Sequence, residues 1–82
     1  MNTTYFDGKQ IVIDPTDVWG MIKLMDRADE FNVPWAGKNE NGEHIQVSVN
    51  KDNITVETFQ HNNWTRENIY YRDGSAEELF HR

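Results

Sequence analysis

The side chains of this chain that could hold a metal ion or move a proton are its histidines and carboxylates. The histidines are His44, His61 and His81, and they show neither the H-x₃-H nor the HExxH spacing that brings metal ligands together. The chain has no cysteine, so a thiolate cannot complete such a site. We therefore interpret the histidines as residues of strand ends and turns, and we expect no metal and no cofactor.

The sequence carries no catalytic motif. It has neither a glycine-rich phosphate loop nor the G-x-S-x-G turn that presents a nucleophilic serine. With 14 Asp and Glu among 82 residues, two carboxylates are expected to lie close together by chance. A carboxylate pair therefore does not by itself indicate acid–base catalysis. We predict that the protein is not an enzyme, with a small metal-dependent hydrolase as an alternative.

Aromatic and arginine side chains gather in residues 59–82. One interpretation is a platform on which the bases of single-stranded nucleic acid stack, and another is cross-strand packing with arginine lying over the rings. A third is a protein-binding face, because Trp, Tyr and Arg dominate interface hot spots. We favour the third, since the net charge of −6 disfavours direct binding to nucleic acid or to an anionic membrane. The side chains concerned are Phe59, Trp64, Arg66, Tyr70, Tyr71, Arg72 and Phe80.

The elements that position these side chains begin with a predicted hairpin. Asp7-Gly8 lies between two strand-prone segments and is typical of a two-residue hairpin turn. A helix is predicted over about residues 15–32, with Asp14 as its cap and Pro15 at its first position. Apolar residues recur there with helical spacing, at Val18, Met21, Ile22, Met25 and Ala28.

Alternating apolar residues predict three strands in the second half of the chain, at about residues 44–49, 54–60 and 64–72. In the last of these strands, we expect Ile69 and Tyr71 to face the helix-covered core. Trp64, Arg66 and Tyr70 would then lie on the face away from the helix. The C-terminal segment has two interpretations: Asp73-Gly74 turns the chain into a last strand, or Ser75 and Glu78 form a capping box that opens a short helix.

These elements predict one domain over residues 1–82 of the α+β class. An antiparallel sheet of four to five strands packs against one main helix, and the C-terminal segment is a short helix or the last strand. The absence of cysteine and of a long apolar run leads us to expect a cytoplasmic protein that does not bind a membrane.

The acidic residues are spread evenly along the chain, so any concentrated negative surface must be assembled by folding. Asp29 lies at the edge of the apolar stripe of the helix, where it is either partly buried with a partner or part of a docking rim. We predict a partner-binding surface drawn from both the acidic and the aromatic residues. Its members are Asp26, Asp29, Glu30, Trp64, Arg66, Glu67, Tyr70, Asp73, Glu77 and Glu78.

The order Gln-x₃-Trp-x-Arg-x-Asn-x-Tyr-x₂-Asp-Gly-x₃-Glu in residues 60–78 resembles the ends of small phage and prophage proteins. The short, acidic, cysteine-free chain as a whole is similar to small phage-encoded inhibitors, including anti-CRISPR proteins. Such a resemblance implies a host cytoplasmic setting and a protein that presents carboxylates where the phosphates of nucleic acid would lie.

Together these features predict a non-enzymatic inhibitor or adaptor that presents an acidic surface to a basic, nucleic-acid-binding host protein. Acidic side chains would steer the association, and one or two aromatic side chains would anchor it. The alternative from a different class is a self-assembling structural module, for example a homodimer formed through an exposed sheet edge or through Trp19 and Trp35. That alternative rests on the three tryptophans of so small a chain, which are difficult to bury together.

Overall fold

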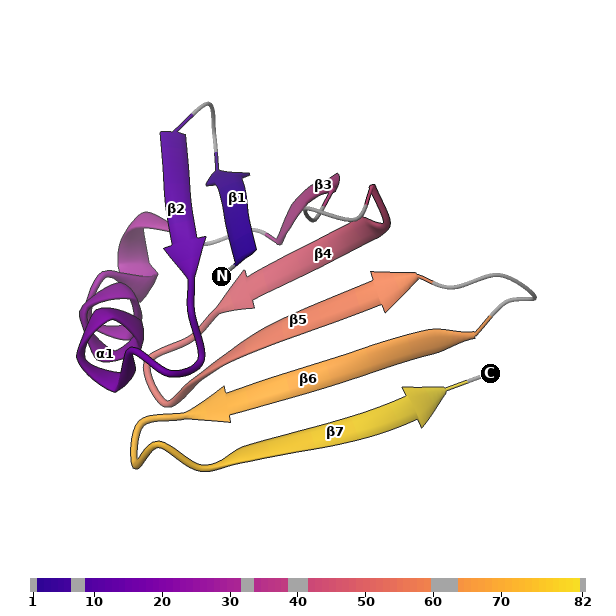
Figure 1. Ribbon diagram of the computed structural model, residues 1–82. Coiled ribbons are helices and arrows are strands. Elements are labelled where there is room, and N and C mark those ends of the chain that lie inside the picture. Colours follow the sequence, from indigo (N-terminus) through magenta and orange to yellow (C-terminus); the bar gives the residue numbers. More distant parts are fainter. Residues whose placement is uncertain (1, 7–8, 32–33, 39–41, 60–63, 82) are drawn as a thin grey trace.

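The computed structural model describes residues 2–6, 9–31, 34–38, 42–59 and 64–81. Within them, two antiparallel sheets and one α-helix form the fold (Figure 1). The order along the chain is β1 (Asn2–Phe6), β2 (Lys9–Ile13), α1 (Val18–Asp26), the 3₁₀ helix η1 (Ala28–Glu30), β3 (Trp35–Lys38), β4 (His44–Val49), β5 (Asn53–Phe59), β6 (Thr65–Tyr71) and β7 (Ala76–His81). Strands β3 to β7 form a five-stranded sheet in sequence order, and β1 pairs with β2 in a separate two-stranded sheet.

The predicted α+β class, with an antiparallel sheet against one main helix, is confirmed. The N-terminal hairpin is also present, because Phe6 of β1 lies opposite Lys9 of β2. Its predicted turn residues, Asp7 and Gly8, lie outside the described residues, as does His61. In Figure 1, α1 and the hairpin lie at the β3–β5 part of the large sheet, while β6 and β7 run along the opposite edge of the sheet.

Helix α1 is shorter than the predicted span of residues 15–32. It begins at Val18 because the side chain of Asp17, not Asp14, caps it by accepting a hydrogen bond from the Gly20 amide at 3.0 Å. Asp14 instead stabilises the preceding turn, where it accepts hydrogen bonds from the Thr16 amide and hydroxyl. A β-carbon on Gly20 would lie 2.5 Å from Oδ2 of Asp17, so glycine at this position leaves room for the cap.

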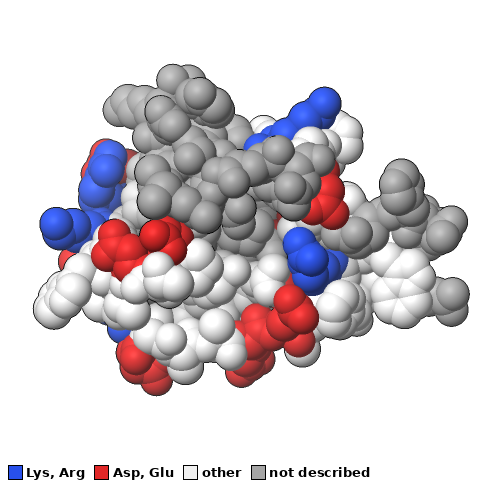
Figure 2. All heavy atoms as spheres, in the orientation of Figure 1, with Lys and Arg blue, Asp and Glu red and all other residues white. Residues whose placement is uncertain are grey.

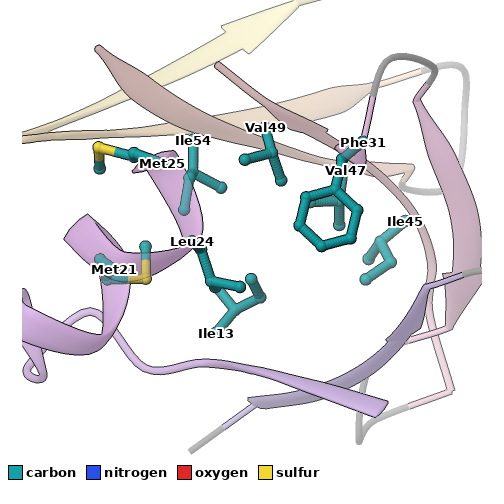
Figure 3. Packing of buried hydrophobic residues seen from close by; sticks show 9 residues of the cluster. All are labelled: Ile13, Met21, Leu24, Met25, Phe31, Ile45, Val47, Val49 and Ile54. Carbon is teal, nitrogen blue, oxygen red and sulfur yellow. The ribbon is translucent and has the colours of Figure 1, made fainter. Parts of the chain in front are cut away.

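The core lies between α1 and the β4–β5 part of the large sheet (Figure 3). Helix α1 contributes Met21, Leu24 and Met25. Met21 and Met25 are among the apolar residues whose helical spacing predicted this helix. The remaining buried apolar side chains come from β2, from the segment after η1 and from β4 and β5: Ile13, Phe31, Ile45, Val47, Val49 and Ile54. Met21 and Met25 therefore serve as core side chains, and Trp19 is left 75% exposed on the helix.

The alternation predicted for β6 is present, but the prediction of its core-facing side chains is wrong. Tyr70 lies directly opposite the fully buried Ile54 of β5, and it packs against the core. Directly opposed residues of an antiparallel pair lie on the same face, so Ile69 and Tyr71 point to the other side. The error arose because β6 lies at the margin of the area that the helix covers. There the more apolar set of alternating side chains is not the set that faces the core.

The C-terminal segment forms a strand, which resolves the choice between strand and helix. Gly74 has a φ of +87°, its amide donates to the Tyr71 carbonyl at 3.1 Å, and the Tyr71 amide donates to the Ser75 carbonyl at 2.9 Å. This is a tight hairpin turn with glycine in the left-handed conformation. Ser75 is held in the turn by the Asp73 carboxylate, so it does not cap a helix.

Arg72 ties this turn to the rest of the molecule. Its guanidinium donates to the Lys51 carbonyl at 2.7 Å and to the Asp26 carboxylate at 2.7 Å. One side chain thus joins the β6–β7 turn, the β4–β5 turn and the end of α1. Among the described residues, no helix is both long enough and apolar enough to cross a membrane.

Candidate functional site

The side of the large sheet that faces away from α1 holds the most concentrated set of carboxylates that the sheet register brings together. We call its β5–β7 part the outer face. The pairing of the three strands places on it Thr55, Glu57 and Phe59 from β5, Thr65, Glu67, Ile69 and Tyr71 from β6, and Glu77, Leu79 and His81 from β7. Extended strands place alternate side chains on opposite faces, so this set follows from the register.

Three glutamates from three adjacent strands form the centre of the outer face. Glu57 lies directly opposite Glu67, and Glu77 lies on the next strand, opposite Ile69. Like charges that oppose each other across a strand pair destabilise a sheet. The Glu57–Glu67 pair therefore makes the outer face less stable than it could be with neutral side chains.

One contact orients a carboxylate of the outer face. Nε2 of His81 lies 3.3 Å from Oε1 of Glu67, and both side chains come from the outer face. Tyr71 shares this face with Glu67 and Glu77. Loss of hydration raises the pKa of Tyr71, and the carboxylates of Glu77 and Glu67 raise this pKa further. The phenol therefore stays neutral beside these carboxylates.

Among the described residues, positive charge is sparse around these glutamates. The only contact that any of them makes there with a basic side chain is the one between Glu67 and His81. Lys38 and His44 lie on the same side of the sheet, but they belong to β3 and β4. The described part of the outer face thus combines glutamates that have no Lys or Arg partner there with partly exposed apolar side chains.

The predicted acidic residues of the helix are separate from the outer face. Asp26 at the end of α1 pairs with Arg72 at 2.7 Å, and Glu30 of η1 pairs with Arg27 at 2.9 Å. The Glu30 pairing raises the pKa of Arg27, through its hydrogen bond first and its charge second. Asp29 is exposed on η1, so it is not the partly buried carboxylate that one interpretation predicted.

Two of the predicted aromatic and arginine residues, Arg66 and Tyr70, lie on the other side of β6. Arg66 and Tyr70 share the face that holds the core, where Glu78 of β7 also lies. Burial raises the pKa of Tyr70, and Arg66 opposes this rise. Trp64 precedes β6 and is 37% exposed. The structure therefore distributes the predicted set over the helix end, the β6–β7 turn with Asp73, and both faces of the sheet.

Glu67 and Glu77 were among the partner-binding residues predicted from the sequence, but the residues that surround them were not. Glu57, Ile69, Leu79 and His81 belong to the outer face, and none was selected as a partner-binding residue. The period-two spacing within each strand was available as a signal. The register between strands was not, and it alone shows that Glu57 opposes Glu67.

On the side of the molecule drawn in Figure 2, the acidic side chains form several separate groups and no continuous patch. Among the described residues, no group of three or more His, Asp or Glu side chains is arranged to hold a metal ion. No protein-family model, curated protein or solved structure matches the chain.

Proposed function

We propose that this protein is a non-enzymatic inhibitor or adaptor that binds a basic surface of a partner protein through its outer face. The observation that carries the proposal is the convergence of Glu57, Glu67 and Glu77 from three adjacent strands. Their charges have no Lys or Arg partner among the described residues. A surface of this kind attracts a basic partner and orients it before contact.

The opposed glutamates support the proposal on energetic grounds. Replacing either glutamate by a neutral residue would remove a repulsion of about 0.2–1 kcal/mol. Local features that reduce stability without an evident structural gain are expected at functional sites. A cation from a partner, placed between Glu57 and Glu67, would turn this repulsion into attraction.

Apolar side chains beside the glutamates supply the second part of a binding surface. Leu79 is 40% exposed and Phe59 is 43% exposed, and both lie on the outer face. Interfaces gain most of their affinity from a few buried apolar or aromatic anchors, while charged side chains set the rate and specificity of association. A basic groove that normally accepts nucleic acid would fit this combination.

The test is capture of a binding partner from a lysate of the host cell by the immobilised protein. The Glu57→Gln/Glu67→Gln variant keeps side-chain shape and removes two charges from the outer face. We expect it to bind the captured partner about tenfold more weakly, since two exposed charge pairs together contribute roughly 1.4 kcal/mol. Wild-type capture should also decline as salt is raised.

The matched control is Asp29→Asn/Asp52→Asn, which removes two charges from exposed positions outside the outer face. It should capture the same partner as the wild type does. Equal weakening by both variants would show that only net charge matters. Capture that is indifferent to salt and to Glu57 and Glu67 would overturn the proposal.

A further inference from the structure

Strand β7 is a free edge of the large sheet. Every residue from Ala76 to His81 is exposed, and among the described strands β7 pairs only with β6. In Figure 1 it runs along the rim, and no described element lies beside its outer edge. The opposite edge strand, β3, differs because it lies near β1. An unprotected edge is a template on which another strand can form backbone hydrogen bonds.

The β6–β7 turn determines which backbone groups of β7 point outward. The Tyr71 amide donates to the Ser75 carbonyl at 2.9 Å, so these two residues form a hydrogen-bonded pair. In an antiparallel ladder such pairs recur at every second residue. Glu77, Leu79 and His81 therefore direct their amides and carbonyls toward β6. Glu78 and Phe80 direct theirs toward the free edge.

This pattern restricts how a second copy of β7 could pair. Hydrogen-bonded pairs must join residues whose backbone groups both point outward, so Glu78 and Phe80 must oppose such residues of the other copy. When the two β7 strands run antiparallel, the two copies are related by a two-fold axis perpendicular to the sheet. Such an axis keeps the outer faces of both copies on the same side.

Charge selects between the two registers that overlap most within β7. A register centred on Glu78 would place the two copies of that glutamate directly opposite each other, which is unfavourable. A register centred on Leu79 places the two Leu79 side chains opposite each other and puts Glu77 opposite His81 of the second copy. Glu78 then lies opposite Phe80, so no like charges oppose each other across the strand pair.

We propose that two copies of this chain associate through antiparallel pairing of their β7 strands, with Leu79 at the two-fold axis. The pairing extends the large sheet continuously across both copies. It hydrogen-bonds the outward amides and carbonyls of Glu78 and Phe80, and it covers part of the exposed Leu79 side chain. It also presents the Glu57, Glu67 and Glu77 clusters of both copies on one side. The inference stands independently of the proposed function, because it needs no partner protein.

The absence of cysteine permits a direct test by disulfide cross-linking. In the proposed register Leu79 forms a non-hydrogen-bonded pair with its own copy, with about 4.5 Å between the two Cα atoms. That distance falls within the range that a disulfide spans. We expect the Leu79→Cys variant to form a covalent dimer under mild oxidation. Glu78→Cys should not, because position 78 faces position 80 of the other copy.

A second test uses the wild-type chain and an edge-blocking variant. Light scattering should show the mass of the wild type rising to that of a dimer with increasing concentration. Glu78→Pro removes an outward amide without breaking the ladder to β6, so it should remain monomeric, whereas Glu78→Ala should still dimerise. Circular dichroism checks that both variants keep the wild-type fold.

Three results would overturn the inference. The first is a wild-type chain that stays monomeric at millimolar concentration. The second is a Glu78→Cys variant that cross-links at least as readily as Leu79→Cys. The third is a folded Glu78→Pro variant that dimerises as the wild type does. Each is measured on the purified chain alone, so failure here is distinguishable from failure to bind a basic partner.

Discussion

At the scale of single residues, the least expected feature is the direct opposition of Glu57 and Glu67. Glu67 contacts His81, while Glu57 lies next to Gln46 of β4 on its other side. Repulsion between the two carboxylates is relieved when either is neutralised. Glu57 offers the cleaner change, because its replacement leaves the contact between Glu67 and His81 in place.

Glu57→Gln is therefore expected to stabilise the protein. The free energy of unfolding should rise by about 0.2–1 kcal/mol at low salt, and the gain should shrink as salt screens the charges. Urea denaturation at two salt concentrations measures both effects. Asp52→Asn, at an exposed turn position, is the control and should change stability less. A loss of stability in Glu57→Gln would contradict the repulsion.

The lowered pKa values of two aspartates predict how the free energy of unfolding changes at low pH. Hydrogen bonds from the Thr16 hydroxyl and amide lower the pKa of Asp14 below its ordinary value of 3.8, and those from Ser75 do the same for Asp73. Because both pKa values are lower in the folded than in the unfolded state, their stabilising contribution is complete above the ordinary pKa. It is lost as pH falls through the lowered pKa.

The Asp14→Asn/Asp73→Asn variant should therefore lose less stability than the wild type between about pH 4 and pH 2. Asparagine can still accept the hydrogen bonds of both turns but does not titrate. Urea denaturation across this pH range gives the comparison. Identical acid dependence in the two proteins would show that other carboxylates govern it.

At the scale of elements, Arg72 determines how the β6–β7 hairpin sits against α1. Its guanidinium contacts a carbonyl of the β4–β5 turn and the carboxylate of Asp26 at the end of α1. Lysine carries the same charge but lacks the planar fork that serves both acceptors. The geometry of the contact, more than its charge, should therefore matter.

Arg72→Lys and Arg72→Ala should each lower the free energy of unfolding by about 1 kcal/mol, a modest figure because both side chains of the ion pair are partly exposed. Asp26→Asn should have a smaller effect, since it leaves the bond to the Lys51 carbonyl intact. Thermal unfolding of the three variants tests this order. If Arg72→Lys were as stable as the wild type, charge alone would account for the contact.

The helix and the strands also show how much of the fold sequence patterns can predict. The alternation of Ile45, Val47 and Val49 defined a strand with the observed bounds, and helical spacing identified Met21 and Met25 as core residues. The face of β6 could not be predicted, because alternation yields two sets of side chains and only the register with β5 distinguishes them. Whether the C-terminal segment forms a strand or a short helix depended on its pairing with β6, which is a contact between elements.

At the scale of the whole molecule, the core that stabilises the fold and the proposed binding surface lie on opposite faces of the large sheet. The core occupies the space between α1 and one face of β4 and β5, as the buried side chains in Figure 3 show. The outer face of β5–β7 takes no part in this core. Its charges can therefore be changed with little effect on packing, which makes it suitable for recognition. The acidic pairs at the helix end lack this freedom, because Arg72 and Arg27 already engage Asp26 and Glu30.

An NMR titration of the protein with an oligo-arginine peptide, which stands in for a basic partner surface, locates the acidic binding site. We predict that amide shifts change most around Glu57, Glu67 and Glu77, and that Glu57→Gln/Glu67→Gln abolishes these changes while Asp29→Asn/Asp52→Asn does not. Shift changes centred on Asp26, Asp29 and Glu30 would place the acidic binding surface at the helix end and contradict the account.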